Sequence, residues 1–149
     1  MKYKWIEPFL VLAVFMTDRL AKALALRRLL PKPVQVLPFF TLSYVENTGV
    51  AFGMFKNKNA FFIVFSVILV GALLVFRRKL AGAGPAARAG IALVLGGALG
   101  NLYDRLAYGF VVDFFDLSFF PAVFNVADSA ITVGACFLAI GLNKKDGGL

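Results

Sequence analysis

Residues 60–76 read AFFIVFSVILVGALLVF, a run of 17 positions without a charged side chain. A helix needs roughly 17 to 25 mostly apolar residues to cross the hydrocarbon core of a bilayer, so this run predicts a membrane-spanning helix. The rest of the chain fits the same environment. Of its 149 residues 60% are hydrophobic and 17 are Phe, and the mean hydropathy is +0.83. So little polar surface cannot cover a soluble globule of this size, and the sequence predicts an integral membrane protein.

Three further stretches are predicted to span the membrane, although each carries polar residues near one end. They cover about residues 5–26, 86–107 and 121–142. The first of them is the weakest, because Asp18, Arg19 and Lys22 interrupt it. Pairing of opposite charges within one helix offsets part of their cost in the membrane. We therefore expect an all-α membrane protein with four transmembrane helices, forming one domain over residues 1–149.

The connecting segments predict how the helices are oriented. Eight cations fall on one side of a four-span topology: Lys2, Lys4, Arg77, Arg78, Lys79, Arg88, Lys144 and Lys145. The other side carries five, all in the long loop after the first span: Arg27, Arg28, Lys32, Lys56 and Lys58. The positive-inside rule then predicts cytoplasmic N- and C-termini. This bias and anionic lipid headgroups explain the net charge of +8, so we expect no nucleic acid partner.

Residues 34–46 (VQVLPFFTLSYVE) lie in the long outer loop. Their β-branched and aromatic side chains alternate in part with other residues, which predicts short strands. We therefore expect a small extracytoplasmic β-sheet in the first outer loop, lying on the membrane surface. Between the third and fourth spans we expect an apolar connector that rests on the membrane, with Asp116 as a solvated loop residue.

The polar residues of the predicted spans are concentrated at the outer side. Antiparallel neighbours bring the C-terminal ends of spans one and three beside the N-terminal ends of spans two and four. This topology gathers Asp18, Arg19, Lys22, Asn101, Asp104, Arg105, Asn125 and Asp128, with Asn47 and Asp113 in loops on the same side. Several of them are three or four residues apart and so share a helix face. Three such faces can point into one cleft just below the outer membrane surface.

The composition restricts the chemistry that these residues can support. The chain has no His and one Cys, which excludes Ser-His-Asp and Cys-His catalysis, His-Glu-x-x-His zinc sites and intrachain disulfides. Two carboxylates from different segments, Asp113 and Asp128, suit an aspartic mechanism, in which close like charges force one group to keep a proton. A Ser-Lys pair that joins Ser43 or Ser129 to Lys22 is an alternative.

Other interpretations stay open at this point. A small proton-coupled carrier could use Asp18, Asp113 and Asp128 as a relay, and a noncatalytic subunit of a membrane assembly is a third class. Against a carrier, the charges gather at one face, and the span 60–76 has no ionisable residue. Several of these residues could instead have purely structural roles. Arg19, Lys22 and Arg105 could snorkel to the interface, and Asp18 could form only a local ion pair with Lys22. Gly96 and Gly100 suit close helix packing, and Cys136 suits side-chain packing.

Four short motifs narrow the choice. In chain order they are NTGVAFG at 47–53, GNLYDR at 100–105, GFVVDF at 109–114 and FNVAD at 124–128. Each motif alone is weak, but the four in this order, together with the four predicted spans, resemble the bacterial lipoprotein signal peptidases, also called signal peptidase II. The resemblance covers nearly the whole chain.

The resemblance implies an intramembrane aspartic endopeptidase of the bacterial cytoplasmic (inner) membrane, with its active site facing outward. Enzymes of this family remove the signal peptide of diacylglyceryl-modified prolipoproteins, cutting before the lipidated Cys. The implied partners are therefore prolipoprotein substrates and membrane lipid. We expect no cofactor, no metal and a monomer.

The resemblance also assigns residues by motif match. Asp113 and Asp128 take the catalytic dyad. Residues that match positions shaping or binding at the site are Asp18, Lys22, Asn47, Asn101, Arg105 and Asn125, and Gly49 fits the outer loop that covers it. The chain departs from the family pattern in the first span, where Arg19 and Ala21 stand at positions at which we expect Gln and a hydroxyl residue.

Overall fold

Four helices and a three-stranded sheet make up the part of the chain that the computed structural model describes, residues 6–49 and 59–146. The helices are α1 (Ile6–Leu29), α2 (Asn59–Ala81), α3 (Pro85–Ala107) and α4 (Val126–Asp146). The strands are β1 (Val34–Leu37), β2 (Phe40–Asn47) and β3 (Val111–Leu117). Predicted features that lie outside the described residues are the start of the first span at residue 5, the cations Lys2, Lys4, Lys56 and Lys58, and residues 50–53 of the first motif.

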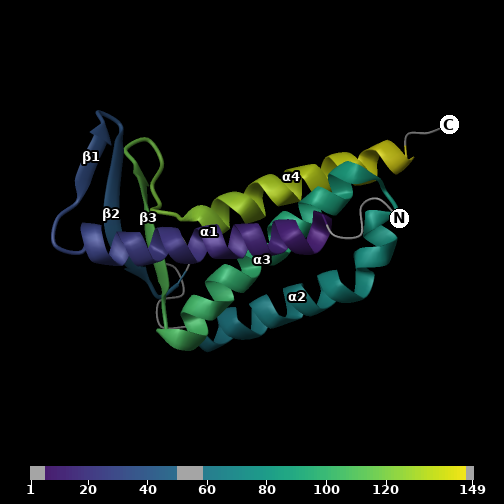
Figure 1. The fold of residues 1–149 in the computed structure, drawn as a ribbon, viewed down its shortest axis with the longest axis horizontal. Coiled ribbons are helices and arrows are strands. Elements are labelled where there is room, and N and C mark those ends of the chain that lie inside the picture. The colour runs from purple at the N-terminus through teal and green to yellow at the C-terminus, as the bar shows by residue number, and fades with distance from the viewer. Residues whose placement is uncertain (1–5, 50–58, 147–149) are drawn as a thin grey trace.

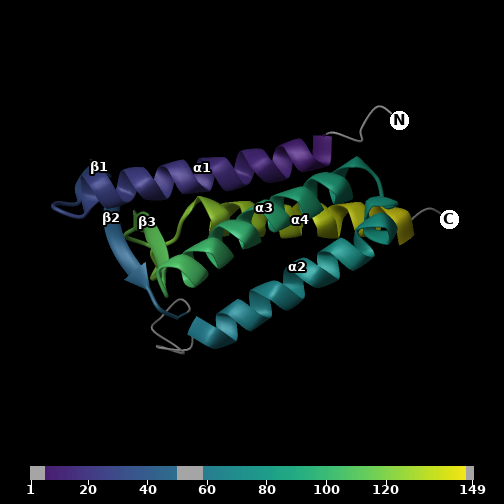
Figure 2. The same ribbon diagram turned by 60° about the horizontal axis from the view of Figure 1, so that its bottom comes forward.

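Helix α3 is the centre of the helical part. It packs against each of the other three helices, and buried residues run along most of its length. Figure 2 shows it between α1 and α2, with α4 beside it. Three helices are long and apolar enough to cross a membrane, α2 over Asn59–Leu80, α3 over Pro85–Ala107 and α4 over Val126–Asn143. The prediction of a mostly helical protein is confirmed, and these three helices are candidate membrane spans.

Helix α1 differs from the other three in composition. With 24 residues it has the length to cross a membrane. Asp18, Arg19 and Lys22 interrupt its apolar run, and it is not among the helices that qualify as spans by length and composition. Its crossing of the membrane therefore remains a prediction.

The two ends of the molecule differ in character. The start of α1, the turn from α2 to α3 and the end of α4 lie together at one end of the helices, whereas the sheet lies at the other end (Figure 1). The polar ends of α1, α3 and α4 meet at the end that carries the sheet. This is the arrangement that antiparallel neighbours predicted.

The sheet is larger than predicted, because its third strand comes from the segment between α3 and α4. The strand order is β1-β2-β3, and both pairings are antiparallel. The apolar connector that we expected there is strand β3, in which Asp113 pairs with Val45 and Asp116 with Thr41. The prediction that Asp116 lies in a solvated loop is therefore wrong. Asp116 is a half-buried strand residue that accepts a hydrogen bond from the Ser43 hydroxyl (3.4 Å).

The fourth helix begins at Val126 and not at residue 121 as predicted. Residues 121–125 are not helical, because Phe124 forms an antiparallel bridge with Phe115 of β3. The backbone N–H and C=O of Phe124 are engaged with Phe115 in that bridge, which holds the chain extended up to the helix start. This short extended segment carries Asn125 to the edge of the sheet, directly before α4.

Close packing of α3 depends on glycine at two positions. A Cβ on Gly97 would lie 2.5 Å from the carbonyl oxygen of Ala127, and a Cβ on Gly100 would lie 2.6 Å from Oδ2 of Asp18. Both distances are too short for a real Cβ. Gly97 therefore lets α4 approach, whereas Gly100 makes room for a carboxylate from α1. The packing role expected for Gly96 is confirmed against Val14 of α1, but Cys136, expected to pack, is exposed on α4.

Candidate active site

The site begins at the N-terminus of α4, where Asn125 and Asp128 cap the helix reciprocally. The Asp128 N–H donates to Oδ1 of Asn125 (2.9 Å), and the Asn125 N–H donates to Oδ2 of Asp128 (3.2 Å). This is a capping box, which satisfies backbone donors that a helix start leaves without partners. The N–H of Ala127 is satisfied from another helix, by Oδ1 of Asp18 at 3.0 Å. The first turn of α4 thus fixes the position of the Asp128 carboxylate.

Asp113 reaches the same place from strand β3. Its side chain is buried, and its two oxygens accept hydrogen bonds from Nδ2 of Asn125 (2.6 Å) and Nδ2 of Asn47 (2.8 Å). Burial in an apolar setting, together with the negative charge of Asp128, raises the pKa of Asp113 to about 7, although both asparagines oppose the shift. Near neutral pH this carboxyl group can therefore hold a proton.

Asn101 of α3 joins the two halves of the site. Its Nδ2 donates to Oδ1 of Asp128 at 2.7 Å. Its Oδ1 accepts from Nζ of Lys22 (2.8 Å) and from Nδ2 of Asn125 (3.2 Å). Asn101 and Asn125 together connect Asp113, Asp128 and Lys22 in one hydrogen-bond network. The carboxylates of Asp113 and Asp128 are thus each held by an amide, on segments that meet only in the folded protein.

Beneath this network lies a cluster of four charged side chains. Lys22 pairs with Asp18 (2.9 Å) and Asp104 (2.8 Å), and Arg19 pairs with the same two carboxylates at 3.0 and 2.6 Å. Asp18 and Asp104 are fully buried. The local ion pair expected between Asp18 and Lys22 exists, but it is one part of a larger cluster. Arg19 does not snorkel outward; its side chain is 16% exposed and points into the protein.

Arg19 and Asp104 belong to the cluster although they were not among the predicted site residues. Asp104 follows Asn101 by three residues, so helical spacing alone places the two on one face of α3. It also lies in the GNLYDR motif, which was a second signal. For Arg19 the predicted topology gave its place among the polar residues, but the departure from the family pattern at this position pointed away from a role in the site.

Gly49 and Arg105 border the site without joining the network. The N–H of Gly49 donates to Oδ1 of Asn47 (3.0 Å), which orients the amide that holds Asp113. Arg105 lies over the ring of Phe62 at 5.1 Å, and its carbonyl oxygen accepts from the Asn59 side chain (3.1 Å). Arg105 thus links the start of α2 to the C-terminal end of α3.

The two predicted serines bond elsewhere. Ser129 donates to the carbonyl oxygen of Asn125 (2.9 Å), and Ser43 contacts Asp116. Lys22 is engaged with Asn101, Asp18 and Asp104. The contacts therefore give no support to a Ser-Lys mechanism.

A cavity of about 780 Å³ opens beside the network, between α2, α4 and the segment that follows β3. Residues with polar side chains that line it are Asn47, Ser66, Asn101, Arg105, Asp128, Ser129 and Thr132, and Gly49 also borders it. Its other walls are largely apolar and include Phe61, Phe65, Phe120 and Ile131. This is a site suited to an extended, mostly apolar ligand that places one polar group near Asp128.

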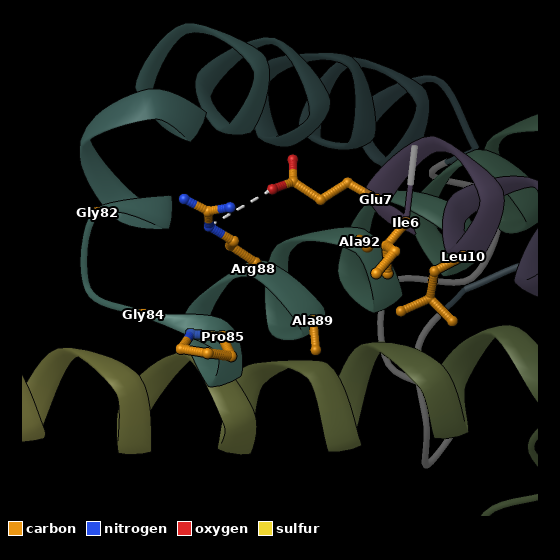
Figure 3. A pocket seen from close by; sticks show the side chains of 9 residues that line it. All are labelled: Ile6, Glu7, Leu10, Gly82, Gly84, Pro85, Arg88, Ala89 and Ala92. Atoms are coloured by element: carbon orange, nitrogen blue, oxygen red, sulfur yellow. Dashed lines mark ion pairs between the residues drawn. The ribbon is translucent and has the colours of Figure 1, made fainter. Parts of the chain in front are cut away.

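A smaller cavity of about 440 Å³ lies at the opposite end of the helices, where α1 begins and α3 follows α2 (Figure 3). Its charged lining residues are Glu7 and Arg88, which form an ion pair at 3.9 Å. Both aspartates of the network lie at the other end, so this cavity is not where paired-carboxylate chemistry can occur.

The comparisons with known proteins agree on one family. The family model of signal peptidase (SPase) II matches residues 10–144. The lipoprotein signal peptidase of Caldanaerobacter subterraneus subsp. tengcongensis is 47% identical over 141 residues, which cover 93% of this chain and 96% of that protein. The lipoprotein signal peptidase of Clostridium acetobutylicum is 42% identical over 152 residues, with 93% and 97% covered.

The fold agrees as well. A bacterial membrane enzyme solved by the in meso method at 2.3 Å resolution has a TM-score of 0.88 to this chain at 30% sequence identity, with 97% of this chain and 92% of that chain covered. The chain therefore belongs to the signal peptidase II family, the lipoprotein signal peptidases, which are membrane enzymes that remove signal peptides from prolipoproteins.

Proposed function

We propose that this chain is an aspartic endopeptidase that works within the membrane and cuts diacylglyceryl-modified prolipoproteins immediately before the lipidated Cys. Asp113 and Asp128 form its catalytic dyad. One observation carries the assignment: the buried carboxylate of Asp113 and the half-buried carboxylate of Asp128, from different segments, are joined through Asn101 and Asn125, and Asp128 lines a largely apolar cavity.

The chemistry follows from a proton shared by the dyad. Two close carboxylates in an apolar setting do not both ionise, so the pair keeps one proton near neutral pH. The ionised member takes a proton from water, whose oxygen attacks the carbonyl carbon of the scissile bond. The protonated member donates to the carbonyl oxygen. When the tetrahedral intermediate collapses, the C–N bond breaks, and the amino group that leaves takes the proton that the first aspartate removed from water. The other aspartate takes back a proton from a hydroxyl of the intermediate as the new carboxyl group forms, so the pair again holds one proton.

The remaining predicted residues have supporting roles in this proposal. Asn101, Asn125 and Asn47 hold the two carboxylates by donating to them. Asp18 and Lys22 support that arrangement from α1, and Gly49 orients Asn47. Arg105 lines the cavity and provides a cation beside the path of the substrate.

The proposed topology places this chemistry at the depth where the substrate is anchored. We assign four membrane spans, including α1, with both termini in the cytoplasm and the site facing outward from the inner membrane. The acyl chains of the substrate then stay in the outer leaflet, beside the apolar walls of the cavity. We assign the enzyme as a monomer.

A cleavage assay tests the assignment. Purified protein in mixed lipid and detergent micelles is incubated with a prolipoprotein carrying the diacylglyceryl group, and loss of the signal peptide is followed by gel shift. We expect the wild type to cleave it and both Asp113→Asn and Asp128→Asn to lose cleavage by more than about a hundredfold, as expected when a member of a catalytic unit is removed. Normal cleavage by either variant would contradict the dyad.

Two controls separate the alternatives. Asp116→Asn removes a carboxylate from the same strand as Asp113, and we expect it to leave cleavage nearly unchanged. A prolipoprotein without the diacylglyceryl group should not be cut, which tests the lipid requirement. Proton flux into vesicles without any cleavage would instead favour the carrier, in which the same aspartates act as a relay.

A further inference from the structure

Two buried carboxylates make matching contacts next to the proposed dyad. Oδ1 of Asp18 accepts the N–H of Ala127 (3.0 Å), the residue immediately before Asp128. Oδ2 of Asp104 accepts the N–H of Val112 (3.1 Å), the residue immediately before Asp113. Each carboxylate therefore holds the backbone one peptide away from a dyad aspartate. The spacing between Asp18 and Asp104 is then part of what sets the spacing of the dyad.

Two cations connect these carboxylates to each other. Nη1 of Arg19 pairs with Asp104 (2.6 Å) and Nη2 with Asp18 (3.0 Å), so that one guanidinium group bridges the pair. Nζ of Lys22 makes a second bridge, at 2.8 and 2.9 Å. A planar guanidinium with donors at fixed positions sets a distance between its partners more rigidly than an ammonium does. The ring of Tyr103, with its centroid 4.8 Å from Cζ of Arg19, supports the plane of the guanidinium.

The charges in this cluster balance, two negative and two positive. Removing one member of a buried ion pair leaves a charge without compensation, which is costly. Glutamine, the residue we expected at position 19, would leave Asp18 and Asp104 with Lys22 as their shared cation. This chain has Arg19 there, and the hydroxyl expected at position 21 is replaced by Ala21. The charge balance of the cluster therefore depends on Arg19.

We propose that Arg19 is a positioning residue, which bridges Asp18 and Asp104 and thereby fixes the backbone on which the two dyad aspartates stand. The inference rests on the proposed function of Asp113 and Asp128. Arg19 does not touch the dyad in this arrangement and acts through the two carboxylates. Its loss should therefore slow the chemical step and leave binding of the lipidated substrate unchanged.

A double-mutant cycle tests the proposal in the full-length protein with a diacylglyceryl-modified prolipoprotein. Arg19→Gln removes one positive charge and Asp104→Asn one negative charge, and the asparagine keeps an oxygen for the Val112 N–H. We expect each single variant to lower kcat about tenfold, with KM within about twofold, as for coupled neighbours in one ion-pair cluster. The double variant restores neutrality and should exceed both single variants in kcat. A double variant at or below either single one would overturn the proposal.

Two further variants keep the result interpretable. Arg28→Gln makes the same change at an exposed position of α1 and should leave kcat and KM as in the wild type. Arg19→Lys keeps the charge, and should retain more activity than Arg19→Gln at equal KM. If Arg19→Gln does not fold, the kinetic comparison is made with Arg19→Lys. A raised KM with unchanged kcat in Arg19→Lys would then contradict the inference. Should the wild type fail to cleave, the proposed function fails; the inference is then judged by non-additivity of the same cycle in thermal unfolding.

Discussion

The raised pKa of Asp113 makes a prediction about stability that does not depend on activity. Its folded value of about 7 lies above the ordinary value of 3.8, so between these pH values the folded protein binds this proton more tightly than the unfolded chain does. The free energy of unfolding must then fall as pH rises through this window. One pKa unit corresponds to about 1.4 kcal/mol, which gives a fall of up to about 4 kcal/mol between pH 4 and pH 7.

Asp113→Asn should abolish the fall of the unfolding free energy with pH. It should also lower that free energy by an amount that does not vary with pH. The two oxygens of Asp113 accept from Asn125 and Asn47, both donors, and an asparagine here would turn its own NH2 group toward one of them. An unsatisfied buried donor costs about 1 to 3 kcal/mol. The variant should therefore be less stable than the wild type at pH 4, where the wild type has lost less than about 1 kcal/mol of this stabilisation, and more stable at pH 8, where the wild type has lost about 4 kcal/mol.

Thermal unfolding in detergent micelles from pH 4 to pH 8 measures this crossover. Asp116→Asn is the matched control, because it makes the same change on the same strand, and its curve should run parallel to that of the wild type. If the Asp113→Asn curve is also parallel to the wild type, the carboxyl group does not take up its proton on folding, and the reasoning is refuted.

Two further predictions concern packing and catalysis. Gly100→Ala places a Cβ against Oδ2 of Asp18 and should lower the free energy of unfolding by about 1 to 3 kcal/mol. Its control is Gly71→Ala, which has open space around it and should be neutral or stabilise α2 by up to about 1 kcal/mol. Equal melting temperatures for the two variants would contradict the packing argument. The cleavage rate at saturating substrate should fall as pH rises above about 7, because the dyad then loses its shared proton. A rate that keeps rising to pH 9 would contradict a mechanism with one protonated aspartate.

Much of the helical part could be predicted from the sequence, because apolar runs report directly on burial in lipid. The run at 60–76 lies within α2, and the polar residues of α1, α3 and α4 meet at the end of the molecule that the topology predicted. Helical spacing was sufficient to place Asn101 with the predicted cluster. These inferences work because they rest on local periodicity.

The remaining features depend on pairings between distant segments. Strand β3 was missed since VVDFFDL does not alternate regularly, and its pairing with β2 is not encoded in either segment alone. The start of α4 was placed too early because residues 121–124 are apolar, and only the bridge to Phe115 shows that this segment is extended. For Arg19 the sequence left two interpretations open, a place in the polar cluster and snorkelling to the interface, since its partner Asp104 lies on another helix.

The bond between Asp18 and the Ala127 N–H also bears on the order in which the protein is made. A chain is synthesised and folds from its N-terminus. On the topology proposed above, α1 enters the bilayer before residues 104 and 127 exist. During that interval Asp18 can be compensated from within α1, by Arg19 and by Lys22 one turn away. Only when the last helix arrives does the carboxylate gain its backbone partner. On the proposed topology and dyad, a nascent chain that lacks α4 therefore has compensation for the charge of Asp18 but has no Asp128, and it should not cleave substrate until α4 has been made and has packed.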